Sequence, residues 1–457
     1  MLTEQRTVTL VQPSSGQGAV TPPQAWGDQL KQFRKGRGLS QSQFAELIRA
    51  TAATWGLNVG CDSRHVIRWE NGGIQMPTAD YLDVLHEIGA PLPAQPCTPE
   101  LTGGHAPAPL RDTSFLEALA TAAVGSSAAL GPWMPALDTP APIPDNVGMA
   151  DVAALQAITR SLRGLDQRHG GHAVRESAVA LLRSSHGLLA GCHGPAKTAM
   201  MVAVADLARL AGWASHDIGD QARARAYCAK AFALAREAGA ESLAASTLYV
   251  VGRISLFEND PAAALRVFQL GQMSAQMGMN RAESARLYTN EAWAHAMLGS
   301  ERGMRDALAR AQEELSRVDD ADVDPWTEVF FSAGEFAGNL SVIFNGLAVA
   351  TDDSALSERY TIASADRASA SLAASTHLRP ARSVLFDHIT VATARFRLGD
   401  VDGAKTAANA ALEMTGEVRS ARATDRLQSM VKDAASCLRK PGVRELCRRV
   451  KRAARAA

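Results

Sequence analysis

Helical periodicity dominates the hydrophobic pattern of this chain of 457 residues. From about residue 146 to about residue 438, apolar side chains recur at three- and four-residue spacing, which is the period of amphipathic helices. No stretch of useful length alternates apolar and polar residues as a half-buried strand would. The pattern therefore predicts an all-α fold.

A repeat is present within this helical region. Turns at 219–220, 259–260 and 299–300 are 40 residues apart, and a fourth, at 399–400, lies 100 residues further on. Residues at fixed distances from these turns are small or alike: Gly212, Gly252, Ala292, Ala392; Ala224, Ala264, Met304, Ala404; Cys228, Phe268, Leu308, Ala408; Ala231, Gly271, Ala311, Ala411. Small residues let antiparallel helices approach closely, so we expect helical hairpins stacked into an α-solenoid. The alternative is an ordinary all-α domain with accidental periodicity.

The spacing of these positions resembles that of the tetratricopeptide (TPR) repeat over roughly residues 195–320, and less closely over 380–415. The period of 40 residues is longer than the usual one of about 34, and the typical proline after the second helix is missing, so the units are TPR-like. The resemblance implies a concave surface, formed by the first helix of each repeat, that binds an extended peptide or protein segment.

Composition divides the chain into five parts. Residues 1–25 are rich in Gln, Ser, Gly, Pro and Thr and read as a flexible arm. Residues 26–93 hold short helical patterns, and 94–145 form a Pro/Gly-rich linker with one short helix. The repeat domain covers 146–438, and a basic helix covers 439–457.

Helix-capping signals organise the part from 26 to 93. The segment LKQFRKGRGLSQSQFAELI has an apolar face, a basic edge and a glycine that ends its first helix. Ser40 and Gln43 form a capping box at the start of the second helix. In CDSRHVIRWENG, Asp62 suits the N-cap of a third helix and Gly72 suits its end.

These features resemble the helix-turn-helix of XRE-type (phage-repressor-like) transcription regulators. The resemblance implies that Val66 and Trp69 pack in the core, while residues of the third helix and the basic edge face DNA. The residues assigned to DNA are Arg34, Lys35, Gln41, Ser63, Arg64, Ile67 and Arg68. Gln41 and the backbone at its helix start would meet a phosphate. Arg64 and Arg68 are four residues apart and share a helix face, and arginine suits bidentate contact with guanine.

Two features of the basic segments leave alternatives open. The interval from Ser40 to Asp62 is 22 residues, longer than in the family, so RATAATWGLNVG must lengthen the second helix or form a loop. The N-terminal module is then either a DNA reader or a small helical module with a solvated basic face. The tail PGVRELCRRVKRAARAA is either a capping helix of the solenoid or a second phosphate-contacting element.

The repeat helices carry an aromatic and cationic stripe at repeat spacing. Its members are Arg209, Trp213, Tyr249, Arg253, Arg286 and Trp293. Arginine can bind a carboxylate, and indole rings can cover apolar groups, so the stripe is a candidate ligand site. The alternative is that the tryptophans belong to the repeat core, because large aromatics at helical spacing usually serve packing.

Composition and motifs limit the function further. Net charge is zero, and the six cysteines are dispersed, which favours reduced thiols in the cytoplasm and indicates neither a zinc site nor a redox pair. We expect no signal peptide and no membrane span. Motifs for nucleotide binding, zinc hydrolysis or a nucleophile elbow are missing, so we expect no enzyme, no catalytic residues, no cofactor and no metal.

The order of the two parts resembles actinobacterial XRE-family regulators with C-terminal TPR-like repeats, an architecture like that of the peptide-sensing RRNPP regulators. The resemblance implies a homodimeric, cytoplasmic transcription regulator that binds double-stranded DNA and responds to a peptide or small-molecule effector. The alternative is a TPR-type interaction scaffold whose helix-turn-helix no longer reads DNA.

Overall fold

The chain is all-α in the computed structural model, which describes residues 23–54, 59–72, 81, 84–85, 87–92, 113–124, 126–135, 137, 147–318, 323–327, 333–374 and 379–456. Within those ranges, the β-structure is one isolated bridge between Val147 and Cys192. The chain divides into two compact units, Met1–His105 and Ala106–Ala457. Residues 1–22 of the expected N-terminal arm lie outside the described part.

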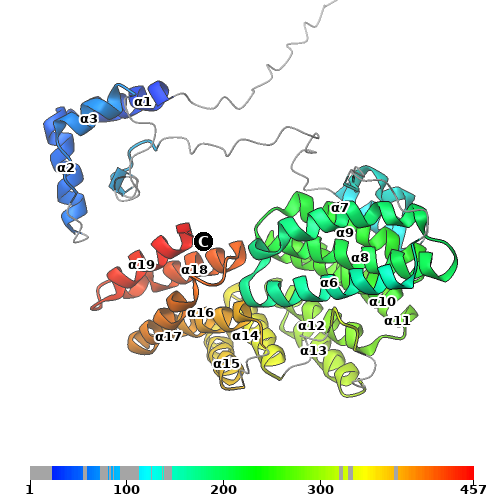
Figure 1. Cartoon of the computed structure of the whole chain (residues 1–457). Coiled ribbons are helices and arrows are strands. Elements are labelled where there is room, and N and C mark those ends of the chain that lie inside the picture. Colours follow the sequence, from blue (N-terminus) through cyan, green and yellow to red (C-terminus); the bar gives the residue numbers. More distant parts are fainter. Residues whose placement is uncertain are drawn as a thin grey trace, which may run out of the picture. The chain divides into compact units, whose positions relative to one another are not determined.

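The smaller unit contains α1 (Pro23–Gly36), α2 (Gln41–Thr54) and α3 (Ser63–Glu70) (Figure 1). The expected caps are confirmed: Gln43 and Ser40 bond each other's backbone, and the Asp62 side chain accepts from the backbone N–H of His65. The helices meet over a core that includes Trp26, Leu30, Phe44, Ile48, Val66 and Trp69. Of the extra segment 49–60, the residues up to 54 lengthen the second helix, whereas 59 and 60 belong to no helix and 55–58 lie outside the described residues.

The larger unit begins earlier than the composition indicated. The short helix predicted within the linker segment 94–145 is present as α5 (Thr113–Val124), and the 3₁₀ helix η1 (Ser127–Trp133) follows it. Both pack against α9, and α5 also packs against α11, so this part of the segment is not a linker. Phe115, Leu119 and Leu130 are fully buried in the same core as the repeat helices. The linker expectation is corrected for these residues, because their apolar side chains are sequestered from water by the repeats.

Helix follows helix through the rest of the larger unit. The helices are α6 (Met149–His169), α7 (Arg175–Leu188), α8 (Gly194–Asp217), α9 (Gln221–Glu237), α10 (Glu241–Phe257), α11 (Pro261–Met277), α12 (Arg281–Met297), α13 (Glu301–Leu315), α14 (Ala333–Ala350), α15 (Ser354–Ala373), α16 (Ala381–Arg397), α17 (Val401–Met414), α18 (Ala421–Asp433) and α19 (Val443–Ala456). Sequential neighbours pack as antiparallel pairs, among them α8 with α9, α10 with α11, and α12 with α13.

The turns recur every 20 residues, not only every 40. A residue with positive φ stands at 219, 239, 259, 279 and 299, and it ends one helix just before the next begins. Asp220, Asp260, Asn280 and Ser300 then cap the following helices with their side chains. Thus the turns between repeats and the turns within them share a residue with positive φ at the end of one helix. The predicted helical hairpins are present as packed pairs of neighbouring helices.

Small residues in the hairpins mark close helix contacts, as the repeat pattern predicts. A Cβ atom on Gly212 would lie 2.8 Å from the Cys228 Sγ atom, and one on Gly252 would overlap the ring of Phe268. Phe268 is fully buried and fills the space that the glycine leaves. The two residues are complementary in volume, which keeps the pair close-packed.

The last helices of the larger unit return to its first ones. Helix α16 packs against α6, and the Arg419 amide, just before α18, donates to the His169 carbonyl at the end of α6 (Figure 1). The carboxylate of Asp217, at the end of α8, is fully buried and bonds Ser420, Arg382 and Arg422. The row of hairpins therefore closes on itself instead of ending as an open superhelix.

The basic C-terminal helix α19 packs on α17 and α18 and buries Val443, Leu446 and Val450. Its arginines, such as Arg448 and Arg452, remain at the surface. No helix in the described ranges has both the length and the apolar character needed to cross a membrane.

Candidate functional site

Helix α3 presents one face to the core and another to solvent. Val66 and Trp69 are fully buried, whereas Arg64 and Arg68 are exposed. Ile67 lies between the two arginines and keeps 40% of its surface exposed, which is unusual for so apolar a side chain. The helix thus offers two guanidinium groups and an apolar contact on a single outer face.

A buried ion pair holds α3 to α1. The Arg34 Nε atom lies 2.5 Å from one Glu70 carboxylate oxygen, and Arg34 Nη2 donates to the other at 3.0 Å. Burial opposes ionisation of Glu70, but hydrogen bonds from Arg34 and from Gln41 outweigh it and lower the pKa of the carboxyl. The bidentate geometry makes this a positioning contact for the whole helix.

This ion pair overturns the assignment of Arg34 to DNA and limits the role of Gln41 to its backbone. Arg34 is buried against Glu70 and Leu39, so its guanidinium is not available to a phosphate. The side-chain nitrogen of Gln41 donates to Glu70, which leaves the start of α2 to supply backbone N–H groups. Lys35 is exposed on α1, and Ser63 is half-buried at the first turn of α3.

The larger unit contains a cavity that all six members of the predicted stripe line. Arg209 and Trp213 come from α8, Tyr249 and Arg253 from α10, and the last two, Arg286 and Trp293, from α12. The cavity has a water-accessible volume of about 170 Å³. The repeat spacing therefore brings the stripe together on one wall.

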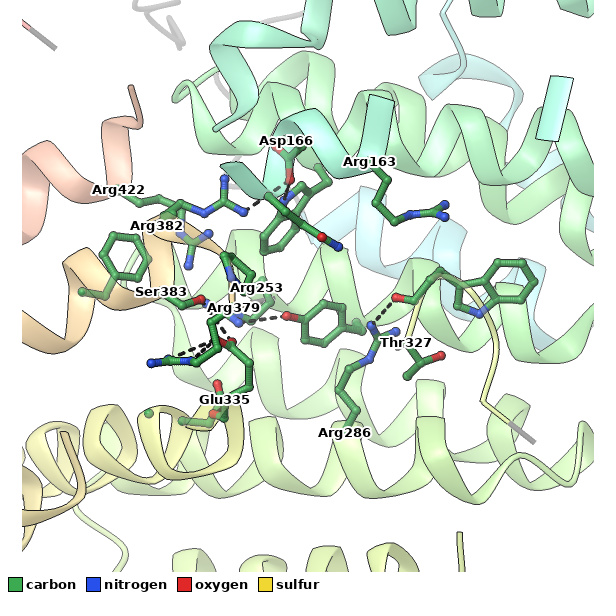
Figure 2. A pocket seen from close by; sticks show the side chains of 18 of the residues that line it. Arg163, Asp166, Arg253, Arg286, Thr327, Glu335, Arg379, Arg382, Ser383 and Arg422 are labelled. Atoms are coloured by element: carbon green, nitrogen blue, oxygen red, sulfur yellow. Dashed lines mark hydrogen bonds and ion pairs between the residues drawn. The ribbon is translucent and has the colours of Figure 1, made fainter. Parts of the chain in front are cut away.

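The opposite wall comes from helices that the stripe did not include. Its charged members, on α6, α14, α16 and α18 or just before α16, are Arg163, Asp166, Glu335, Arg379, Arg382, Asp387, Arg422 and Arg426. In all, eight arginines and three carboxylates line the cavity, so its lining is strongly cationic. Figure 2 shows side chains of both walls pointing toward one another.

Sequence reasoning missed this wall because its members come from helices before and after those of the stripe, and two of them, Arg422 and Arg426, lie more than 100 residues beyond Trp293. Arg422 and Arg426 do share a face of α18, since they are four residues apart. That spacing was the one available signal, and it could not identify which surface the pair faces.

Aromatic rings and guanidinium groups alternate along the first wall. The Trp213 and Tyr249 rings stack with centroids 6.2 Å apart and planes tilted by 20°. The Arg253 guanidinium carbon lies 4.6 Å from the Trp293 ring centre, and that of Arg286 lies 4.0 Å from the Tyr249 ring centre. Both tryptophans are half-buried, so they pack in the repeats and also line the cavity.

Five of the lining arginines have carboxylate partners near them. Arg163 bonds Asp206 at 2.6 Å, and Arg286 bonds Glu283 at 2.6 Å. Arg379 bonds Glu335 and Asp387, while Arg382 bonds Asp217 and Asp166. Arg209 has a weaker contact with Asp206, at 3.5 Å. These pairs tie the two walls and neighbouring helices together.

The charges of three lining arginines, Arg253, Arg422 and Arg426, are balanced much less by nearby carboxylates. Among the described residues, Arg253 bonds the hydroxyl of Tyr249 at 3.0 Å and no carboxylate. Arg422 shares Asp217 with Arg382, at a distance of 3.4 Å from Arg422. Among the residues that the structure describes, Arg426 has no hydrogen bond or ion pair and instead lies over the Phe386 ring, 4.2 Å from its centre. Burial and the charge of Arg253 lower the pKa of Arg422 well below its ordinary value, and lower that of Arg426 to about 10. Both groups still carry their charge at neutral pH.

A second cavity, with a water-accessible volume of about 590 Å³, adjoins the first. Both cavities are lined by Arg253, Trp293, Val342, Arg422 and Arg426. Beyond these, the lining of the second cavity combines apolar residues, among them Leu256, Phe257, Met297, Val349 and Ile389, with polar and charged ones that include His216, Asn345, Arg397 and Asp425. Arg253, Arg422 and Arg426 therefore lie where the two cavities meet.

No cluster of histidine, cysteine and acidic residues suited to a metal ion occurs in the part of the chain that the structure describes. Comparisons with protein-family models, curated proteins and solved structures find no match to this chain.

Proposed function

We propose that this protein is a sequence-specific DNA-binding transcription regulator. In this proposal, the smaller unit is an XRE-type helix-turn-helix that inserts α3 into the major groove. The larger unit is a TPR-like domain that dimerises and senses a peptide or small-molecule effector in the cationic cavity. A cytoplasmic location is part of the same proposal.

The observation that carries the DNA proposal is the outer face of α3. Arg64, Ile67 and Arg68 are exposed there, while the opposite face is anchored by Trp69 and by the Arg34–Glu70 ion pair. A helix used only for packing gains nothing from an exposed isoleucine between two exposed arginines. Guanine and thymine edges in the major groove offer matching acceptors and a methyl group.

The test is selection of a binding sequence from random duplexes, followed by footprinting of the full chain. We expect two half-sites about one helical turn apart, as a dimer of such modules requires. Arg64→Ala and Arg68→Ala should each cost about 1–3 kcal/mol on the selected sequence and relax its specificity. Lys35→Ala is the matched control, since it removes an exposed charge and should weaken all sequences alike.

The runner-up function is a TPR-type interaction scaffold. For a scaffold, the same experiment should enrich no DNA sequence. The Arg64→Ala/Arg68→Ala double variant should then bind DNA no differently from the wild type. Protection of the same operator at the same concentration by wild type and double variant would also refute the assignment of α3.

The effector proposal rests on the cavity. A ligand that binds both walls contacts helices from the beginning and the end of the larger unit at once. Its binding would favour one curvature of the helical row, and a preference of a few kcal/mol is enough to shift the population of two states. Such a shift would change how two tethered DNA-binding units are spaced, without contact to Arg64 or Arg68.

A further inference from the structure

We propose that the effector is a small phosphate monoester with an apolar or aromatic substituent, bound with its phosphate between Arg253, Arg422 and Arg426. This inference rests on the proposed function for the biological role of the ligand, but the site itself is argued from the cavity alone.

The charge balance of the cavity points to an anion. Most lining arginines already have carboxylate partners, and their pairing accounts for their presence as structural contacts. Arg253, Arg422 and Arg426 line the same space and repel one another, and among the described residues their one ion pair is that of Arg422 with Asp217. Asp387 and Asp425 attract Arg426 without forming an ion pair with it. Gathering like charges away from water destabilises the folded protein unless a counter-charge is bound.

A phosphate suits the three guanidinium groups better than a single carboxylate. A phosphate monoester carries about −1.5 to −2 charges at neutral pH and has three strong acceptor oxygens. Arginine binds such groups in bidentate fashion, and the three arginines come from two helices, α10 and α18. One phosphate can therefore accept from both sides of the space between them.

The surroundings indicate what the phosphate is attached to. The Trp293 ring lies beside Arg253 at the junction of the two cavities, and Phe386 lies beneath Arg426. The second cavity continues from the junction with apolar side chains, Leu256, Phe257, Met297 and Ile389, beside polar ones such as Thr390 and Asp425. Burying an apolar substituent there gains roughly 25 cal/mol per Å² of apolar surface. Inorganic phosphate alone would leave this compartment unused.

The experiment measures binding of phenyl phosphate and of inorganic phosphate to the full chain by calorimetry, with benzyl alcohol as the uncharged comparison. We expect phenyl phosphate to bind at least ~10-fold more tightly than inorganic phosphate, and benzyl alcohol not to bind detectably. Arg426→Gln should weaken both phosphates by ~10-fold or more. Trp293→Leu should reduce the preference for phenyl phosphate over inorganic phosphate.

The matched control is Arg236→Gln, which removes an arginine paired with Glu241 away from both cavities and should leave binding unchanged. Folding is monitored through the melting temperature without ligand. Arg426→Gln should keep or raise it, since the substitution relieves repulsion, whereas a structural role for Arg426 predicts a lower value. Arg426→Lys keeps the charge without the planar fork and should bind phenyl phosphate with intermediate affinity.

Equal binding of phenyl phosphate to wild type and Arg426→Gln would overturn the inference, and so would no binding at millimolar concentration. Operator binding by the same samples separates the two proposals. If DNA is bound but phenyl phosphate is not, only the ligand class is wrong. If no operator is selected, the regulator proposal fails, while the phosphate titration still decides the site.

Discussion

At the scale of residues, partners decide what an arginine or a histidine does. Arg34 and Lys35 are neighbours on the basic edge of α1, yet Arg34 is buried in an ion pair and Lys35 is exposed. Arg286 is neutralised by Glu283, while Arg253 on the preceding repeat has a tyrosine hydroxyl instead. Both side chains of each pair are cationic, so the difference in pairing comes from the residues that the neighbouring helices place beside them.

His216 makes the larger unit sensitive to acid. Burial, and next the charge of Arg422, lower the pKa of this histidine to about 3, from an ordinary value of 6.5. The folded protein keeps it neutral, whereas the unfolded chain protonates it below pH 6.5, so stability falls as the pH is lowered through this window. His216→Gln should remove that part of the pH dependence.

The measurement is urea unfolding of wild type and His216→Gln at pH 7 and at pH 5. Because other groups titrate in both proteins, only the difference between them is informative. We expect the wild type to lose about 2 kcal/mol more than the variant between the two pH values. Parallel losses in the two proteins would show that His216 is not kept neutral by the fold.

At the scale of elements, the repeat depends on turns and on small residues at helix contacts. Helices of similar length alternate with turns every 20 residues, and each turn uses a positive φ to reverse the chain. Gly252 on α10 leaves room for Phe268 on α11, so the glycine is required by a neighbour and not by its own backbone. Gly164 on α6 has no atom near the position of a Cβ and serves as a contrast.

Gly252→Ala should therefore destabilise the larger unit by about 1–3 kcal/mol, the usual cost of overpacking a well-filled core. Gly164→Ala should stabilise it by about 0.5–1 kcal/mol, because alanine loses less entropy in a helix. Thermal unfolding of the two variants beside the wild type checks both signs at once. A neutral Gly252→Ala variant would mean that α10 and α11 can separate without cost.

Across the larger unit as a whole, the main structural feature is the contact between its last helices and its first ones, which closes the row of helices. Asp217 joins the end of α8 to α16 and to the start of α18, across more than 160 residues of sequence. This contact encloses the cavity between the first and the last helices. Asp433, which bonds Arg397, instead joins α16 to α18 within the C-terminal part.

Asp217→Asn should weaken the contact between the first and last helices, because it removes the counter-charge of the buried Arg382 and Arg422. The free energy of unfolding should fall by about 3–5 kcal/mol. Hydrogen exchange should then accelerate in α16 and α18 and at the end of α6, more than in α10 to α13. Asp433→Asn is the control, and it should accelerate exchange only around α16 and α18. Unchanged exchange at the end of α6 in Asp217→Asn would show that the row stays closed without this carboxylate.

The sequence by itself determined the local features of this protein. The all-α class, the caps at Ser40 and Asp62, the four hairpin turns and the six residues of the stripe all follow from patterns within about 40 residues. Such patterns are readable because capping, turn chemistry and helical periodicity act between near neighbours along the chain. The stripe itself lines one cavity because equal repeats superimpose equal positions.

Only the tertiary structure decided the features that join distant segments. The packing of α5 on the repeats, the pairing of Arg34 with Glu70 and the wall formed by Arg382, Arg422 and Arg426 have no local signature. Each depends on which apolar faces are buried together, and burial then determines whether a charge must be paired, exposed or bound by a ligand. The proline-rich composition of 94–145 gave no sign that its short helix packs on the repeats, and a net charge of zero gave no sign of a cavity lined by eight arginines. Both quantities average over residues that the fold separates or gathers.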